Sequence, residues 1–425
     1  QLFHQKISLK LERKNGYKKK KKPETFPSLS KPVLKTSQPL MAPSATFLTY
    51  PRPSFAIFSR NCNPFPTTRV CSWKPFSVKA SSTSLGHSTT SASLVADQPS
   101  KTLFKSNSWQ WRFDGKSIKI NYEEHGNGST GPSKEILMLP TISDVSTAAE
   151  WRTVAEDIVQ RAGKLNWRAT IVDWPGLGDS DRPKLDYNAD VMEKFLVDFV
   201  NSSDSPVSQS ENGLVIFGGG HAAAILVRAA KKGLVKPSAI AAVAPTWAGP
   251  LPIVFGRDSS MENRYGFLRG TLRSPGVGWM VYNILVSNVN AIESQYKSHV
   301  YADPENVTSD IVKSRYALTK REGSRYAPAA FLTGLLDPVK SRDEFVELFA
   351  AFEGQLPVLV VSSKGSPRRS KAEMEALRGA KGVSKFAEVP GALLPQEEYP
   401  AIVADELYRF LQENYEPEEW DRLIV

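Results

Sequence analysis

From residue 109 onwards, short apolar segments alternate with segments of helical periodicity. The apolar segments predict strands at residues 109–113, 117–126, 135–140, 168–174, 239–245, 356–363 and 384–391. Helical spacing predicts helices at residues 147–163, 190–200 and 399–414. Residues 214–230 predict a strand, a tight glycine turn and an Ala-rich helix. This alternation requires parallel crossovers, so the sequence predicts an α/β fold with a mostly parallel, doubly wound sheet.

Between residues 246 and 348 the strand pattern gives way to helical and irregular sequence, which predicts a helical lid inserted into the sheet. Arginines and aromatic residues alternate in its stretch 264–288: Arg264, Tyr265, Phe267, Arg269, Arg273, Trp279 and Tyr282. Such a mixture could hold an amphipathic acid or an anionic lipid headgroup. We expect the plainer arrangement, in which the aromatic rings pack on the core and the arginines stay in water.

The N-terminal part differs from the rest in composition. Residues 1–40 are basic and lack hydrophobic periodicity, which indicates a disordered segment or sequence upstream of the true start at Met41. Residues 41–96 are rich in Ser, Thr and Pro and contain no Asp or Glu, as is typical of an organelle transit peptide. An ordinary disordered tail is the alternative. We therefore expect a folded domain at 97–425 and location in the chloroplast, most simply the stroma.

This division changes the charge argument. The whole chain has a net charge of +10, but the basic excess lies in residues 1–96, so residues 97–425 carry −4. Nucleic-acid binding is therefore not supported. Cys62 and Cys71 also lie in the leader, which excludes a disulfide or a thiol nucleophile from the predicted domain. We expect no membrane span, no cofactor and no metal site, because the histidines lack ligand spacing.

Three kinds of site compete for the glycine turn at 218–220. A dinucleotide site would use Gly218, Gly220 and Ala223 as G-x-G-x-x-A, but the acidic residue expected about 20 positions later is absent. A phosphate-binding P-loop needs Gly-Lys-Ser/Thr, which His221 and the alanine after it exclude. The third kind is the sharp turn that presents a nucleophile in G-x-S-x-G.

A second motif favours the third interpretation. Residues 172–183, VDWPGLGDSDRP, resemble the D-x-x-G-x-G-x-S-x-x-P sequence that follows the fourth strand of α/β-hydrolases. Residues 389–400, VPGALLPQEEYP, resemble the last strand and histidine loop of that family. The resemblance extends over residues 109–414 and implies an α/β-hydrolase-fold protein, plant-like in its leader.

The resemblance also implies three catalytic positions, and none holds the usual residue. Gly220 stands at the nucleophile position, Ser366 at the acid position and Leu393 at the histidine position. Pro140 and Thr141 stand where the oxyanion loop usually has His-Gly. A glycine cannot attack a carbonyl and a leucine cannot accept a proton. The sequence therefore predicts a pseudoenzyme that binds a small apolar or amphipathic ligand or a protein partner.

An active enzyme remains the alternative. If the register slips by one residue, His221 occupies the nucleophile position and could act as a base beside backbone N–H groups, in an esterase-like or lipase-like reaction. The candidate pocket residues are Thr141, Ser143, His221 and Trp247. Asp337 follows an apolar helix, and we expect it to be a cap or turn residue.

Overall fold

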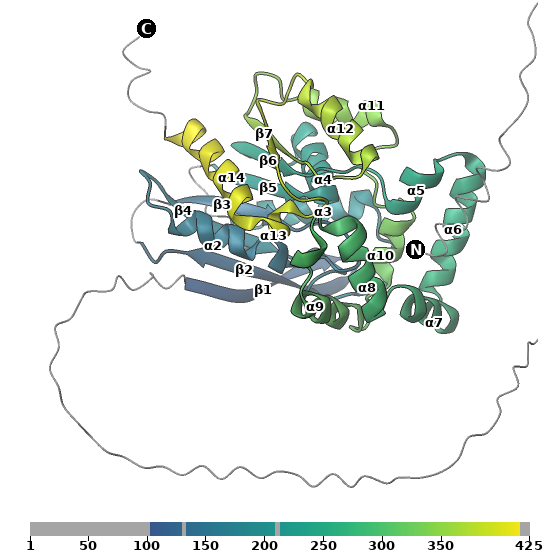
Figure 1. Ribbon diagram of the computed structural model, residues 1–425. Helices are drawn as coiled ribbons and strands as arrows, with labels where there is room; N and C mark the ends of the chain where they lie inside the picture. The colour runs from purple at the N-terminus through teal and green to yellow at the C-terminus, as the bar shows by residue number, and fades with distance from the viewer. Residues whose placement is uncertain (1–102, 130–132, 209–212, 417–425) are drawn as a thin grey trace, which may run out of the picture. The chain divides into compact units, whose positions relative to one another are not determined.

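The computed structural model describes residues 103–129, 133–208 and 213–416 (Figure 1). The predicted leader segments 1–40 and 41–96, and both cysteines, lie outside these residues. Of the helices in the described ranges, none combines the length and the apolar character that a membrane-spanning segment needs.

Eight strands form one sheet in the order β1-β2-β4-β3-β5-β6-β7-β8. The strands are β1 (Leu103–Phe113), β2 (Lys116–Gly126), β3 (Ser133–Leu139), β4 (Asn166–Val172), β5 (Val215–Gly219), β6 (Ala239–Val243), β7 (Val358–Ser363) and β8 (Lys385–Val389). β1 and β2 form an antiparallel hairpin, and β2 is antiparallel to β4. The other strand pairs are parallel. This order is that of the α/β-hydrolase fold and confirms the predicted fold class.

Helices cover both faces of the sheet. One apolar cluster joins the sheet to α2 (Arg152–Gln160) and α14 (Pro400–Tyr415). The cluster on the other face includes α3 (Ala189–Asn201), α4 (Gly220–Lys231), α11 (Arg342–Ala350) and α12 (Arg368–Arg378). Successive residues of β3 alternate between the two clusters, since Ile136 belongs to the first and Leu137 to the second. The continuous apolar strands of the sequence therefore reflect burial on both sides.

The helix predicted at 147–163 is interrupted, which corrects the sequence interpretation. A short 3-10 turn, η1 (Ala148–Glu150), precedes α2, and Thr147 makes no side-chain cap hydrogen bond. Asp173 takes the capping role from outside the helix, because its Oδ1 accepts the backbone N–H of Ala148 at 2.7 Å. Glu150 points inward to accept the N–H of Thr141 at 2.9 Å. These tertiary bonds explain the break.

The motif at 172–183 builds a loop. Besides Ala148, the Asp173 carboxylate accepts the N–H of Asp179 at 2.8 Å and the side-chain amide of Asn121 at 3.0 Å. Gly178 has φ +53°, and a Cβ there would overlap that carboxylate. Burial raises the pKa of Asp173 to about 6. The aspartate and glycine of the motif therefore form one compact unit that fixes the chain after β4.

Helical sequence fills the segment between β6 and β7, which we call the helical insertion (residues 244–357). Besides α11 it contains α5 (Pro250–Phe255), α6 (Ser259–Arg273), α7 (Gly276–Leu285), α8 (Val289–Gln295), η2 (Tyr296–Val300), η3 (Pro304–Asn306), α9 (Ser309–Thr319) and α10 (Tyr326–Leu332). The expectation that its aromatic rings pack on the core is correct for Tyr265 and Tyr282, which are buried. It is wrong for Phe267 and Trp279, whose exposed fractions are 79% and 60%.

Candidate functional site

The candidate site is built around a tight turn between β5 and α4. β5 ends at Gly219 and α4 begins at Gly220, with only the peptide bond between them. Gly220 has φ +48°, in the left-handed region that glycine adopts without a steric penalty. This conformation places Gly220 at the point of the turn, and His221 follows inside the first turn of α4.

Thr141 occupies the space that a side chain at position 220 would need. A Cβ built on Gly220 would overlap Oγ1 of Thr141, and it would lie 3.9 Å from Oγ1 of Thr246. Thr141 itself is buried, and Glu150 accepts its backbone N–H. The loop after β3 is thus fitted to a glycine at the turn, and the N–H of Thr141 is already used inside the protein.

The loops after β7 and β8 come together, as a catalytic acid and histidine would require. The N–H of Gly365 donates to the carbonyl of Gly391 at 2.8 Å. Ser366 is buried and shares a hydrogen bond with the Ser363 hydroxyl. Leu393 is half-buried, and its N–H donates to the carbonyl of Val300 at 3.0 Å. The backbone brings the two positions close, but it presents a hydroxyl and an isobutyl group there.

His221 is completely buried. Its Nε2 lies 2.9 Å from the Leu336 carbonyl, so this nitrogen carries the proton and donates it. Its ring packs edge-on against Phe331, with 5.4 Å between ring centroids. Burial lowers the pKa of His221 to about 4, so the imidazole is neutral near pH 7.

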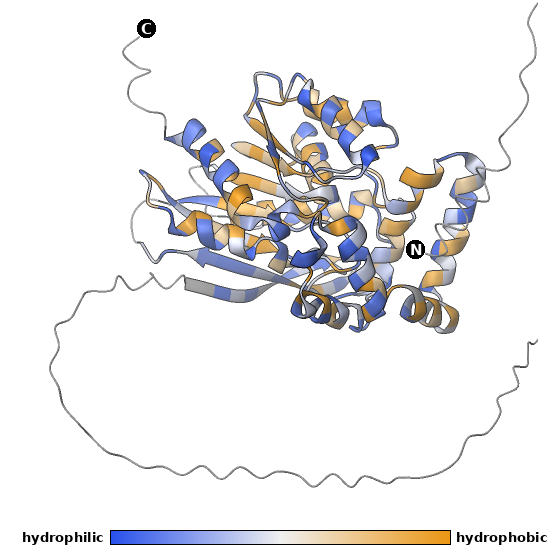
Figure 2. Cartoon of the chain, in the orientation of Figure 1, coloured by the Kyte–Doolittle hydropathy of each residue, from blue (hydrophilic) through white to orange (hydrophobic). Residues whose placement is uncertain are grey.

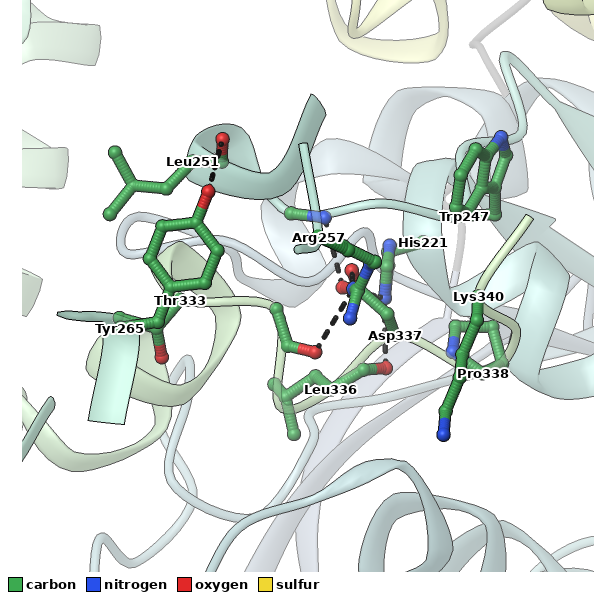
Figure 3. Close-up of polar contacts among 12 residues, drawn as sticks. His221, Trp247, Leu251, Arg257, Tyr265, Thr333, Leu336, Asp337, Pro338 and Lys340 are labelled. Carbon is green, nitrogen blue, oxygen red and sulfur yellow. Dashed lines mark hydrogen bonds and ion pairs between the residues drawn. The ribbon is translucent and has the colours of Figure 1, made fainter. Parts of the chain in front are cut away.

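Asp337 lies beside His221, a contact that the sequence does not predict (Figure 3). Its Oδ1 is 3.5 Å from Nε2 of His221 and accepts the N–H of Gly249 at 2.9 Å. Its Oδ2 forms an ion pair with Arg257. Its backbone N–H donates to the Gly334 carbonyl at 3.4 Å, as in the expected turn, and its side chain also anchors the start of the helical insertion. Nothing in local sequence spacing signals this contact, because its partners come from three separate segments.

The other predicted pocket residues have polar partners within the fold. Ser143 is half-buried, and its hydroxyl accepts the N–H of Val145 at 3.3 Å. Trp247 is half-buried and donates its indole N–H to Glu373 at 2.9 Å. Thr141 adjoins Gly220, whereas the Trp247 indole is directed to α12.

A pocket of about 310 Å³ opens between η1, α9 and α13 (Pro395–Glu398). Its lining is mixed and includes the polar side chains of Glu150, Arg315, Gln396 and Glu397. Gln396 is 1% exposed, and neither atom of its amide group has a hydrogen-bond partner among the described residues. A Cβ built on Gly219 would lie 3.0 Å from Nε2 of Gln396, so this lining residue lies next to the glycine turn. Thr141, Ser143, His221 and Trp247 are not part of its lining.

Three ionisable side chains of this pocket, Glu150, Arg315 and Glu397, influence one another electrostatically. Arg315 is buried, forms an ion pair with Glu397 and donates its Nε–H to the Tyr296 hydroxyl at 3.0 Å. Burial, followed by the nearby charge of Glu397, raises the pKa of Glu150 to about 8. Glu150 is therefore mainly protonated near pH 7. Within the described ranges, no group of three or more His, Cys, Asp or Glu side chains is arranged to hold a metal ion.

The family follows from a comparison with family models. The model described as the alpha/beta hydrolase family matches residues 125–406. The chain belongs to this family. The match includes the glycine turn, the Asp173 loop, the helical insertion and the loops of Ser366 and Leu393. No curated protein matches the chain.

Several solved structures share the fold at low sequence identity. A serine hydrolase involved in carbazole degradation is 16% identical, with a TM-score of 0.51 over 72% of this chain and 99% of its own. Cfl2 from Burkholderia cenocepacia is 18% identical, with a TM-score of 0.52 over 72% and 95%. The haloalkane dehalogenase DatA from Agrobacterium tumefaciens C58 is 17% identical, with a TM-score of 0.50 over 73% and 97%. These likenesses establish the fold and leave the activity of this chain open.

Proposed function

We propose that the protein is a non-hydrolytic member of the alpha/beta hydrolase family that binds a molecule without cleaving it. The observation that carries the proposal is the glycine turn. Gly220 has no side chain to attack a carbonyl carbon, and Thr141 fills the space where a side chain would stand. Ser366 and Leu393 supply neither a carboxylate nor an imidazole at the other two positions. A covalent acyl-enzyme cannot form without the nucleophile.

The pocket beside Gln396 supports binding of a small molecule. Buried amide and carboxylate atoms without partners are costly unless a ligand or water satisfies them. Gln396 offers both a donor and an acceptor, and Oε2 of Glu397 also lacks a partner among the described residues. A small ligand with polar groups fits this lining. The apolar or amphipathic ligand and the protein partner that the sequence predicts remain further proposals.

A specific observation favours a second candidate, an esterase-like enzyme that uses His221. Asp337 lies 3.5 Å from the imidazole, and Nδ1 of His221 has no hydrogen-bond partner in the described structure. Two features weigh against this candidate. His221 is completely buried, and its Nε2–H is engaged by Leu336.

A hydrolysis assay separates the two candidates. We expect the purified protein to cleave p-nitrophenyl esters no faster than buffer and to resist labelling by a fluorophosphonate probe. We expect His221→Leu to lower the free energy of unfolding by about 1–3 kcal/mol, because it leaves the Leu336 carbonyl unpaired, without any change in the ester assay. The exposed His299→Leu serves as the control for stability. Ester turnover that His221→Leu removes at unchanged stability would establish the second candidate, and serine labelling would refute a lost nucleophile.

We further infer that the protein acts in plastids, because the sequence of residues 41–96 is acid-free and rich in Ser and Thr. A fluorescent protein fused to residues 41–100 should enter plastids in leaf cells. Cytosolic fluorescence would contradict this proposal, and mitochondrial fluorescence would correct the organelle.

A further inference from the structure

Helix α7 presents an uncovered apolar face. Val277, Met280 and Ile284 share one face by helical spacing, and all three are exposed, with 63% exposure at Ile284. Trp279 on α7 and Phe267 on α6 extend this surface. We call these five residues the α7 face. Figure 2 shows the hydrophobic character of α7, which lies with α5 and α6 at the side of the sheet away from α14.

The opposite side of α7 holds the helix in place. Tyr282 is buried, and Gly278 packs directly on the backbone at the end of α6, where a Cβ would overlap the Leu272 carbonyl. On the exposed side, next to Met280 and Trp279 by helical spacing, Asn283 accepts a hydrogen bond from Lys320 at 3.0 Å, which ties α7 to the end of α9. The α7 face is therefore exposed because the helix is fixed with this side outward.

Two exposed cations lie on the elements next to α7. Residues 276–285 of α7 contain no charged side chain. Arg264 is exposed on α6, and Lys320 is exposed beside α7. Arg273 at the end of α6 adds no net charge, because it pairs with the exposed Asp186 at 2.9 Å. An uncharged apolar surface flanked by cations is complementary to the interface of an anionic bilayer.

We propose that the α7 face is a membrane-docking surface that inserts its side chains into the headgroup region of an anionic lipid bilayer. Trp279 suits this location, because an indole combines a large apolar ring with one N–H donor. Burial of exposed Trp and Ile side chains supplies the binding free energy, and Arg264 and Lys320 favour anionic headgroups. A second copy of this chain is a weaker fit, because two such surfaces would place their flanking cations against each other.

Vesicle co-sedimentation of the full chain tests the proposal. The probes are vesicles of phosphatidylcholine alone and vesicles that also contain phosphatidylglycerol. We expect binding to the anionic vesicles, and we expect the double variant Trp279→Ser with Ile284→Ser to weaken it at least about tenfold. Both side chains are exposed, so the variant should keep the wild-type melting temperature. Arg264→Gln should weaken binding to the vesicles that contain phosphatidylglycerol and should not change binding to vesicles of phosphatidylcholine alone.

A matched control variant and a salt series establish whether vesicle binding depends on the α7 face itself. Leu234 and Ile402 are similarly apolar and exposed, at 44% and 42%, but lie outside the α7 face. Leu234→Ser with Ile402→Ser should bind like the wild type. Because residues 1–96 are basic, the assay is repeated at high salt, where binding through the leader falls and apolar insertion persists.

Equal binding by the wild type and the α7 variant would overturn the proposal. The proposal would also be overturned if the wild type does not bind vesicles but forms a dimer in light scattering, and the α7 variant abolishes that dimer.

Discussion

Replacing Gly220 by serine is expected to lower the free energy of unfolding by about 2–5 kcal/mol. Two costs combine. Any residue other than glycine is strained at φ +48°, and its Cβ would overlap Oγ1 of Thr141. Serine at this position should also give no ester hydrolysis, because Ser366 and Leu393 would still lack the acid and the base.

Two further variants separate these costs in equilibrium urea unfolding. Gly233 also has a positive φ, +70°, but a Cβ there would meet no atom within 4 Å. Gly233→Ser should therefore cost only the backbone strain of about 1–2 kcal/mol. Thr141→Ala removes the overlapping hydroxyl, so Gly220→Ser should be less damaging in that background. A double-mutant cycle measures the coupling directly.

Equal losses for Gly220→Ser and Gly233→Ser, with no coupling to Thr141, would contradict the close fit of Thr141 to the glycine turn. The proposed function would then lose its main support, which is that Thr141 fills the space of a side chain at position 220. A serine variant that became as stable as the wild type and reacted with fluorophosphonate would show a site still prepared for a nucleophile.

The stability of the protein should fall as the pH rises from neutrality to alkaline values, and Glu150→Gln should remove most of this fall. The ordinary pKa of a glutamate is 4.5, and burial raises that of Glu150 to about 8. Between these values the unfolded chain has lost a proton that the folded protein keeps, so stability decreases with pH. The contribution is fully present below pH 4.5 and is lost as the pH passes through about 8. The pKa difference corresponds to roughly 5 kcal/mol at most.

Urea unfolding between about pH 6.5 and 9 isolates this group. His221 has a lowered pKa of about 4, so its contribution changes only below its ordinary value of 6.5. Asp173, with a pKa of about 6, has largely finished titrating. Glu150→Gln keeps an oxygen that can accept the N–H of Thr141 but has no charge to bury. The exposed Glu353→Gln is the control and should leave the pH profile unchanged.

A third variant, Glu397→Gln, changes the surroundings of Glu150 and leaves Glu150 itself in place. It removes the ion-pair partner of the buried Arg315, so it should lower stability at neutral pH by about 3–5 kcal/mol. It should also move the Glu150 titration to lower pH, because the charge of Glu397 raises the pKa of Glu150. A wild-type profile that stays flat up to pH 9, or the same slope in Glu150→Gln, would show that Glu150 is not a protonated buried carboxyl.

The sequence predicted the architecture well because its signals are local. Continuous apolar strands, the glycine turn at 218–220 and the motif at 172–183 each depend on residues close together in the chain. The residues at the three positions that the family resemblance implies, Gly220, Ser366 and Leu393, could also be read directly from the sequence. The break at Thr147 could not, because Asp173 and Thr141 cause it from other segments.

The sequence alone determined the fold class and family resemblance, since hydrophobic period and turn chemistry dictate which elements form and how they alternate. Only the tertiary structure decided what surrounds the candidate site. It seats Thr141 against Gly220, buries His221 beside Asp337 and joins Glu150, Arg315, Gln396 and Glu397 in one pocket. It also leaves Phe267 and Trp279 exposed, although both are apolar. Burial and pairing depend on which distant segments meet, and the pKa of Glu150 and the neutrality of His221 follow from that packing.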